Sequence, residues 1–250
     1  MVIWLDDREA LPWPGTVPEH EVPGLIAAGG RLTPARLDEA YRKGLFPWYG
    51  PGQPVLWWSP DPRMVLPVAA FRLHRSLRKT LARFLATPGN TIRFDGDFRA
   101  VIKACAATPR EGQDGTWIVP AMVHAYTVWH QTGRVHSVET WEGNRLVGGL
   151  YFVAIGRMVF GESMFSHRSE ASKFALAALV AACRRRGVAL IDCQQHTGHL
   201  ASLGAREIPR ADFLRHVAAA VQAPAPAAWG CTPEDWAGLD PRLAAAAPPV

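Results

Sequence analysis

The fold is decided by the stretch VHSVETWEGNRLVGGLYFVAIGRMVFGES, residues 135–163. It contains three strand-forming segments rich in β-branched and aromatic residues, separated by a Gly143-Asn144 turn and a second turn at Gly156. Such short turns join neighbouring antiparallel strands. The stretch therefore predicts an antiparallel meander of three strands.

Further elements extend this meander into a larger sheet. An alanine-rich helix at about residues 170–186 is followed by a strand at 189–193, which returns the chain to the sheet. Upstream, the sequence predicts two more strands and four helices, at residues 64–66, 91–94, 33–44, 76–85, 98–106 and 120–132. The alternation predicts fold class α/β (α+β), a mixed sheet flanked by helices.

The 250 residues are enough for two domains. Residues 1–61 are rich in proline, glycine and tryptophan, and we expect a small N-terminal domain there. Residues 62–222 contain the sheet. Residues 223–250 are dominated by alanine and proline, which cannot maintain a packed core. We expect a flexible tail, and we expect removal of residues 226–250 to leave activity unchanged.

Composition argues against several classes of protein. With 48% hydrophobic residues the chain is not mainly disordered, yet no uncharged apolar run approaches the length of a bilayer span. The N-terminus lacks the pattern of a signal peptide. The four cysteines form no CxxC pair and no zinc-site spacing, which indicates reduced thiols. We therefore expect a soluble cytoplasmic protein without a metal.

The basic residues are concentrated in one region. The chain has 27 Lys plus Arg against 22 Asp plus Glu, and residues 63–110 contain ten of the former but two of the latter. On the predicted helix near residues 76–85, outward cations suit contacts with phosphate, although a basic helix face is often simply solvated. These cations are Arg75, Arg78, Lys79 and Arg83.

Polar side chains follow two of the predicted strands. Glu162 lies at the end of the meander, and Asp192 and Gln194 lie at the end of the strand after the alanine-rich helix. Strand alternation directs Asp192 and Gln194 to the same side. Because ligands bind at strand ends in open sheets, these three residues are candidates for chemistry. The alternative is that Asp192 caps a turn and Glu162 is solvated.

Tryptophan is abundant, with 10 residues, and several lie in Pro/Gly-rich loops. Two interpretations are open for Trp48, Trp57, Trp58 and Trp117. They are either platforms on which nucleobases stack or ordinary core residues at the domain junction.

Six ordered motifs resemble those of one family, the leucyl/phenylalanyl-tRNA–protein transferases. They follow the family's order and spacing from about residue 24 to residue 215. The motifs are GLFPW at 44–48, LWWSPDPR at 56–63, GTWI at 115–118, GESMFS at 161–166, LIDCQ at 190–194, and ASLGA with EIPR at 201–205 and 207–210.

The resemblance implies a C-terminal domain like the N-acetyltransferase (GNAT) superfamily. It implies transfer of Leu or Phe, less readily Met, from aminoacyl-tRNA to the N-terminal Arg or Lys of a protein, which marks that protein for degradation. The implied partners are Leu-tRNA and Phe-tRNA as donors and such proteins as acceptors. The enzyme is expected to be a monomer that needs no membrane and no cofactor, because an aminoacyl ester is already activated.

The resemblance also assigns roles to residues. Gln194 contacts the reacting amine or carbonyl, Asp192 orients Gln194 and attracts the amine's positive charge, and Glu162 holds the cationic groups of the substrate. The donor side chain is expected among Leu150, Val159, Met164, Leu176, Leu179 and Ile191. The terminal adenosine is expected near Trp48, Trp117, Tyr41 and Tyr126, and acceptor-stem phosphates near Arg75, Arg78, Lys79 and Arg83.

Two functions of other classes stay open at this point. An N-acyltransferase that uses acyl-coenzyme A would have the same fold, but SHRSEA stands at residues 166–171 where a Gly-rich pyrophosphate loop is needed. A non-catalytic RNA-binding protein would explain the charge and the tryptophans, but not Glu162, Asp192 and Gln194.

Overall fold

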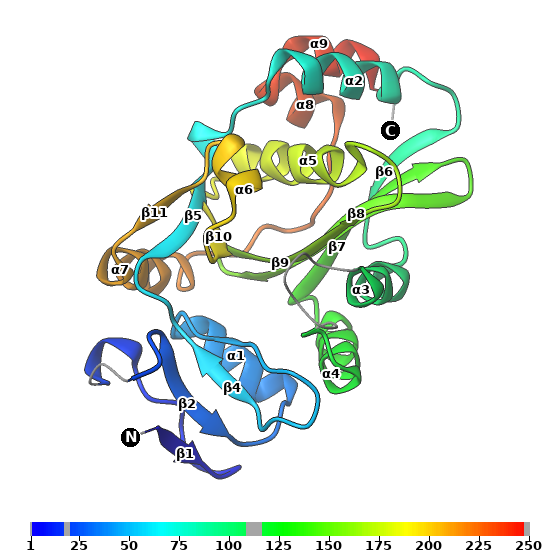
Figure 1. Cartoon of the computed structure of the whole chain (residues 1–250). Helices are drawn as coiled ribbons and strands as arrows, with labels where there is room; N and C mark the ends of the chain where they lie inside the picture. Colours follow the sequence, from blue (N-terminus) through cyan, green and yellow to red (C-terminus); the bar gives the residue numbers. More distant parts are fainter. Residues whose placement is uncertain (1, 18–20, 109–116, 248–250) are drawn as a thin grey trace.

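The computed structural model describes residues 2–17, 21–108 and 117–247 and shows two sheets (Figure 1). The smaller sheet has the strand order β1-β2-β4-β3 and lies in the N-terminal part, together with helix α1. The bounds of these elements, in the same order, are Ile3–Leu5, Leu25–Gly29, Leu56–Trp58 and Phe46–Pro47, with α1 at Pro34–Arg42. The helix predicted at residues 33–44 is confirmed, and Thr33 caps it by accepting the N–H of Arg36.

The larger sheet has the strand order β11-β5-β10-β9-β8-β7-β6. Its strands, in that order, are Arg206–Ile208, Arg63–Pro67, Leu190–Gln194, Met158–Ser166, Arg145–Ile155, Val135–Glu142 and Asn90–Phe94. The predicted meander is β7-β8-β9 and is confirmed. Helix α5, Ala171–Arg185, connects β9 to the parallel strand β10, and the other neighbouring pairs are antiparallel. The predicted mixed α/β sheet is therefore confirmed.

The two faces of the larger sheet are covered by different helices, as alternation along β8 shows. Tyr151 and Val153 pack towards α3, α4 and α7, whereas Leu150 and Phe152 pack towards α5 and α2 (Figure 1). The helices are α2 at Arg75–Leu85, α3 at Phe98–Ala107, α4 at Pro120–His130, α6 at Gly198–Ser202 and α7 at Arg210–Ala220, with single turns at Pro14–Thr16 and Val68–Ala70. No helix within the described ranges has the length and apolarity needed to cross a membrane.

A shared hydrophobic core joins the N-terminal part to the larger sheet. Leu37 and Tyr41 of α1 and Phe46 of β3 are buried in the same cluster as Tyr151 and Phe160 of β8 and β9. This packing places α1 and β3 beside the ends of β9 and β10.

The expectation of a flexible tail over residues 223–250 is wrong for the described part of that segment. Two short helices, α8 at Pro233–Leu239 and α9 at Pro241–Ala246, lie against α5 and α2 (Figure 1). Trp236 is 3% exposed and Leu243 is fully buried. Each helix starts with a capping residue followed by proline and contributes one large apolar anchor, a pattern that average composition does not reveal.

Candidate functional site

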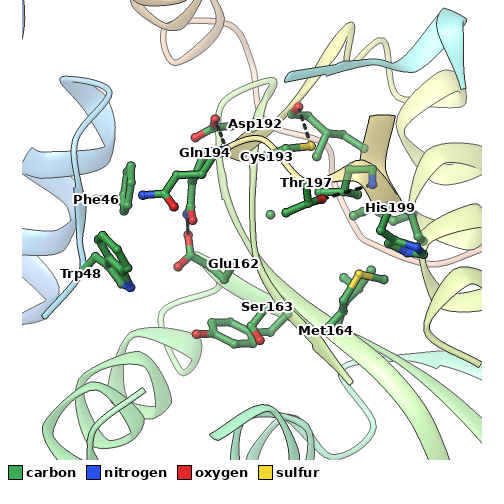
Figure 2. Close-up of a pocket in the computed structure, with 18 of the residues that line it drawn as sticks. Phe46, Trp48, Glu162, Ser163, Met164, Asp192, Cys193, Gln194, Thr197 and His199 are labelled. Carbon is green, nitrogen blue, oxygen red and sulfur yellow. Dashed lines mark hydrogen bonds between the residues drawn. The ribbon is translucent and has the colours of Figure 1, made fainter. Parts of the chain in front are cut away.

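A pocket of about 370 Å³ opens where β9 and β10 separate (Figure 2). The two parallel strands are paired only at Val159 with Ile191 and at Phe160 with Asp192. Gln194 then adopts a left-handed φ of 63°, and the register of β10 against β5 shifts between Asp192 and Gln194. Because β10 turns away from β9 here, Gln194 at the end of β10 and Glu162 in the middle of β9 face a common space. The expectation that Glu162 ends its strand is wrong, since β9 continues to Ser166.

Glu162 of β9 lies at the centre of the polar side of this pocket (Figure 2). Its Oε1 accepts hydrogen bonds from the Tyr41 hydroxyl at 2.6 Å and from Nε2 of Gln194 at 3.1 Å. Burial raises the pKa of Glu162 to about 8; the nearby Asp192 charge also raises it, while the tyrosine hydrogen bonds oppose the shift. The structure thus brings Glu162 and Gln194 together, as the sequence predicts, and gives Glu162 a pKa near neutrality.

Tyr41 and Tyr126 hold Glu162 and do not present a surface to a ligand. Both are fully buried, their hydroxyls lie 2.6 Å apart, and that of Tyr126 is 3.3 Å from Oε2 of Glu162. Burial is also the main reason why the pKa of each phenol is raised well above its ordinary value. The two rings therefore lie behind Glu162 and have no exposed surface. Their place near the terminal adenosine stays a prediction.

Asp192 is fully buried and forms an ion pair with Arg63, at the start of β5. Nε and Nη2 of Arg63 donate to the two carboxylate oxygens at 2.8 and 2.6 Å. Oδ1 of Asp192 also accepts the backbone N–H of Gln194 at 2.9 Å. Asp192 does orient Gln194, but through the backbone. The expectation that it attracts a substrate's positive charge stays a prediction, and in this structure its charge is paired with Arg63.

Arg63 was missed among the candidate residues. The signal for it in the sequence is a lone arginine directly before the apolar run Met64-Val65-Leu66. A charge at such a position is buried only if it has a partner. The sequence alone does not show that this partner is Asp192, which is 129 positions away.

The apolar side of the pocket comes from β8, β9, β10 and α5. Five of the six residues predicted for an apolar side chain line it, namely Leu150, Met164, Leu176, Leu179 and Ile191. Val159 does not line it and is fully buried. Its side chain is enclosed in the hydrophobic cluster that includes α5, although its partner Ile191 in β10 reaches the pocket.

Aromatic side chains of the N-terminal part lie on the opposite rim (Figure 2), and the segment before α4 contributes one more to the pocket lining. Trp48 and Trp117 line the pocket, as does Phe46. Trp48 packs edge-on against Trp58, whose indole N–H donates to the Trp48 carbonyl at 2.7 Å. Trp57 is fully buried in the core, so among these tryptophans the core interpretation holds for Trp57. The GTWI motif lies partly outside the described residues, at 115 and 116.

The basic residues predicted on α2 differ in exposure and in whether they form an ion pair. Arg75, Lys79 and Arg83 are exposed, whereas Arg78 forms an ion pair with Asp240 of the C-terminal segment at 3.4 Å. Figure 1 shows α2 on the side of α5 away from the N-terminal part. The α2 cations therefore do not belong to the pocket itself.

A reactive thiol does not account for the pocket. Cys193 lines it, but burial raises the pKa of this thiol well above its ordinary value and keeps it protonated. In the part of the chain that the structure describes, no three His, Cys, Asp or Glu side chains are grouped as metal ligands would be.

Comparison with known proteins links both sheets to one family. Residues 65–218 match the family model "Leucyl/phenylalanyl-tRNA protein transferase", and residues 30–61 match the model of its N-terminal domain. Proteins named leucyl/phenylalanyl-tRNA–protein transferase are similar over nearly the whole chain. The relative from Leptothrix cholodnii is 59% identical over 97% of this chain and 96% of its own. The relative from Methylibium petroleiphilum is 62% identical over 94% of this chain and 86% of its own. The relative from Cupriavidus taiwanensis is 56% identical over 98% of this chain and 100% of its own.

The likeness to solved structures is weaker. A structure of L-PGS from Bacillus licheniformis covers 53% of this chain and 45% of its own, with 10% identity and a TM-score of 0.36. Likeness to the N-acetyltransferase superfamily therefore stays an expectation from the sequence.

Proposed function

We propose how this chain works on the premise that it belongs to the leucyl/phenylalanyl-tRNA–protein transferase family. It is an enzyme that transfers an amino acid from aminoacyl-tRNA to the N-terminus of a protein. Our proposal concerns the substrates and the residues that act on them. The observation that carries it is the half-buried Glu162–Gln194 pair at the edge of an apolar pocket.

The apolar side of the pocket receives the side chain of the donor amino acid. Its leucine, isoleucine and methionine side chains offer no polar partner, so they favour an unbranched or γ-branched apolar group such as Leu, Phe or Met. The pocket volume of about 370 Å³ leaves room for such a side chain and for the ester beside it. Leu-tRNA and Phe-tRNA are therefore the proposed donors.

Gln194 and Glu162 act on the reacting atoms. Because Nε2 of Gln194 donates to Glu162, its Oε1 is left to accept an N–H of the incoming α-amine. The amine nitrogen attacks the ester carbonyl carbon, a C–N bond forms, and the C–O bond to the tRNA ribose breaks. Glu162 takes the proton that the amine loses and returns it to the leaving ribose oxygen.

The pKa of Glu162 suits this proton transfer. A value of about 8 lies close to the value of ~7.7–8.0 that is usual for an α-amino group. A base with this pKa accepts the proton without binding it irreversibly. The same carboxylate, when ionised, attracts the positive charge of an acceptor that begins with Arg or Lys.

The tRNA is bound outside the apolar pocket. Trp48 and Trp117, which line the rim, are proposed to stack on the terminal adenosine. The exposed Arg75, Lys79 and Arg83 of α2 are proposed to contact backbone phosphates. We further propose that the enzyme acts as a monomer in the cytoplasm, and that the added residue marks the acceptor for degradation.

The experiment is transfer of labelled Leu or Phe from its tRNA to two versions of one protein, beginning with Arg or with Ala. We expect label on the Arg version only, and none from labelled acetyl-coenzyme A. Glu162→Gln and Gln194→Ala should each lower kcat by roughly 100-fold or more, in the range found for groups that act on the transition state.

Glu234→Gln is the matched control for Glu162→Gln, because Glu234 is an exposed glutamate in the first turn of α8. It should transfer at the wild-type rate. Equal labelling of both acceptors, or full activity of Glu162→Gln, would contradict the proposed roles while leaving the family assignment intact.

A further inference from the structure

The guanidinium of Arg63 is held on every side by groups that belong to different parts of the fold. β5 is antiparallel to β10, and Asp192 is opposite Val65. Arg63 lies two residues before Val65, hence on the same face, from which a long side chain reaches diagonally to Asp192. Two parallel hydrogen bonds of 2.8 and 2.6 Å result, the geometry in which Arg recognises a carboxylate most specifically.

Two aromatic rings enclose the same guanidinium. The ring centre of Phe46, in β3 of the N-terminal part, lies 4.7 Å from the guanidinium carbon, and that of Phe213, in α7, lies 4.4 Å from it. Arg63 is fully buried, and its Nη1 has no hydrogen-bond partner among the described residues. The hydrogen bonds of the guanidinium are therefore committed to Asp192, and the rings prevent it from taking another position.

Asp192 transmits this constraint to Gln194. Oδ1 of Asp192 accepts from both Nε of Arg63 and the backbone N–H of Gln194. That N–H belongs to a residue with a φ of 63°, a left-handed conformation that a residue with a side chain adopts only when its surroundings impose it. The hydrogen bond from Gln194 to Asp192 is such a constraint, and it fixes the direction in which the Gln194 side chain leaves the backbone.

We propose that Arg63 is a positioning residue of the transfer reaction, which fixes Asp192 by its two hydrogen bonds and thereby holds Gln194 in the conformation that reaches the substrate. The inference rests on the proposed function, in which Gln194 contacts the reacting amine. It makes Phe46 and Phe213 supports of catalysis, although Phe213 is not among the residues that line the pocket.

The discriminating variant is Arg63→Lys, which retains the positive charge but not the planar pair of donors. If the ion pair only stabilised the fold, the folded Arg63→Lys protein would retain the wild-type kcat. If Arg63 positions Gln194, kcat should fall by about 100-fold, the loss expected for a misplacement of about 1 Å, while KM for aminoacyl-tRNA changes by less than about threefold. Arg186→Lys, in the ion pair with Asp235 on the other side of α5, is the matched control and should retain kcat.

Phe213→Leu provides a second, milder variant in case Arg63→Lys does not fold. It leaves Arg63 and Asp192 in place and removes one ring, and we expect kcat to fall by roughly threefold to tenfold at constant KM. Circular dichroism and thermal unfolding identify the folded fraction, against which each kcat is expressed.

The outcomes separate the two proposals. If the wild type transfers Leu or Phe, Gln194→Ala is inactive, and folded Arg63→Lys or Phe213→Leu retains the wild-type kcat, then Arg63 is only structural and the inference fails alone. If Gln194→Ala is fully active, the proposed role of Gln194 fails instead. A rise in KM with unchanged kcat in Arg63→Lys would also overturn the positioning role.

Discussion

At the scale of single residues, Glu162 couples the chemistry to pH. Its pKa is raised from 4.5 to about 8, so between these values the folded protein holds a proton that the unfolded chain has lost. The contribution of Glu162 to stability therefore falls as pH rises through this interval and levels off above pH of about 8. The same burial that adapts the carboxyl to an amine destabilises the protein at alkaline pH.

This leads to a prediction for Glu162→Gln, which cannot ionise. Relative to this variant, the free energy of unfolding of the wild type should decline with pH from 4.5 to about 8, by at most about 1.4 kcal/mol per pH unit. Urea unfolding at a series of pH values measures the difference between the two proteins. A difference that does not change with pH would show that Glu162 titrates as an ordinary surface carboxyl.

Tyr41 offers a second test at this scale, because its phenol donates to Glu162 from a fully buried position. Tyr41→Phe should lower kcat by roughly tenfold or more, the value of one hydrogen bond to a charged group. KM for aminoacyl-tRNA should stay within about threefold, since the ring has no exposed surface to offer a tRNA. Steady-state kinetics with varied aminoacyl-tRNA separates the two constants.

Tyr49→Phe is the matched control, as another buried tyrosine of the N-terminal part. Tyr49 is not among the described hydrogen-bond partners of Glu162, which are Tyr41, Tyr126 and Gln194. An increase in KM for Tyr41→Phe without loss of kcat would restore the alternative in which Tyr41 contacts the adenosine.

At the scale of elements, α8 and α9 complete the cover of the larger sheet. Trp236 lies against the cluster formed by α5 and α2, so Trp236→Ala should lower the free energy of unfolding by about 3–5 kcal/mol. Trp13→Ala, at a position 50% exposed, should change it by less than about 1 kcal/mol. Removal of residues 226–250 is accordingly expected to destabilise the protein. A Trp236→Ala variant as stable as the wild type would mean that this segment is detached in solution.

The same elements show what the sequence can predict. The meander and the helix before β10 can be predicted because their periodicity and turn residues are local features of the sequence. Their predicted bounds lie within a few residues of those observed. Strands β1 and β3, of three and two residues, are too short to show a period and depend on contacts with other strands.

The site divides in the same way. That Glu162 and Gln194 lie close together follows from their places in two predicted strands, although Glu162 lies in the middle of β9, Met158–Ser166, and only Gln194 ends its strand. That Asp192 pairs with Arg63 does not, because a sequence pattern carries no information on which buried charges are partners. Val159 is apolar and lies in the same strand as Glu162, yet its paired neighbour Ile191 lines the cavity and Val159 does not, a difference that depends on the packing around each side chain.

At the scale of the whole molecule, charge is distributed so that the pocket and the basic surface are separate. The net charge of +5 includes Arg75, Lys79 and Arg83 on the exposed face of α2. The carboxylate of Asp240 is already paired with Arg78. A tRNA bound at the pocket and at α2 must therefore extend across the molecule, and the phosphate contacts at α2 would contribute affinity rather than chemistry.

Salt dependence of tRNA binding measures those contacts directly. Each phosphate contact contributes about 0.7–0.9 to the slope of log affinity against log salt concentration, because a bound counterion is released. Replacing Arg75, Lys79 and Arg83 together by Gln should then reduce the slope by roughly 2–3, with kcat unchanged at saturating tRNA. Asp240→Asn should change it in the opposite direction, because the substitution frees Arg78. If the triple variant binds with the wild-type slope, the tRNA backbone contacts another face, and the exposed cations of α2 are solvated charges without a role in this reaction.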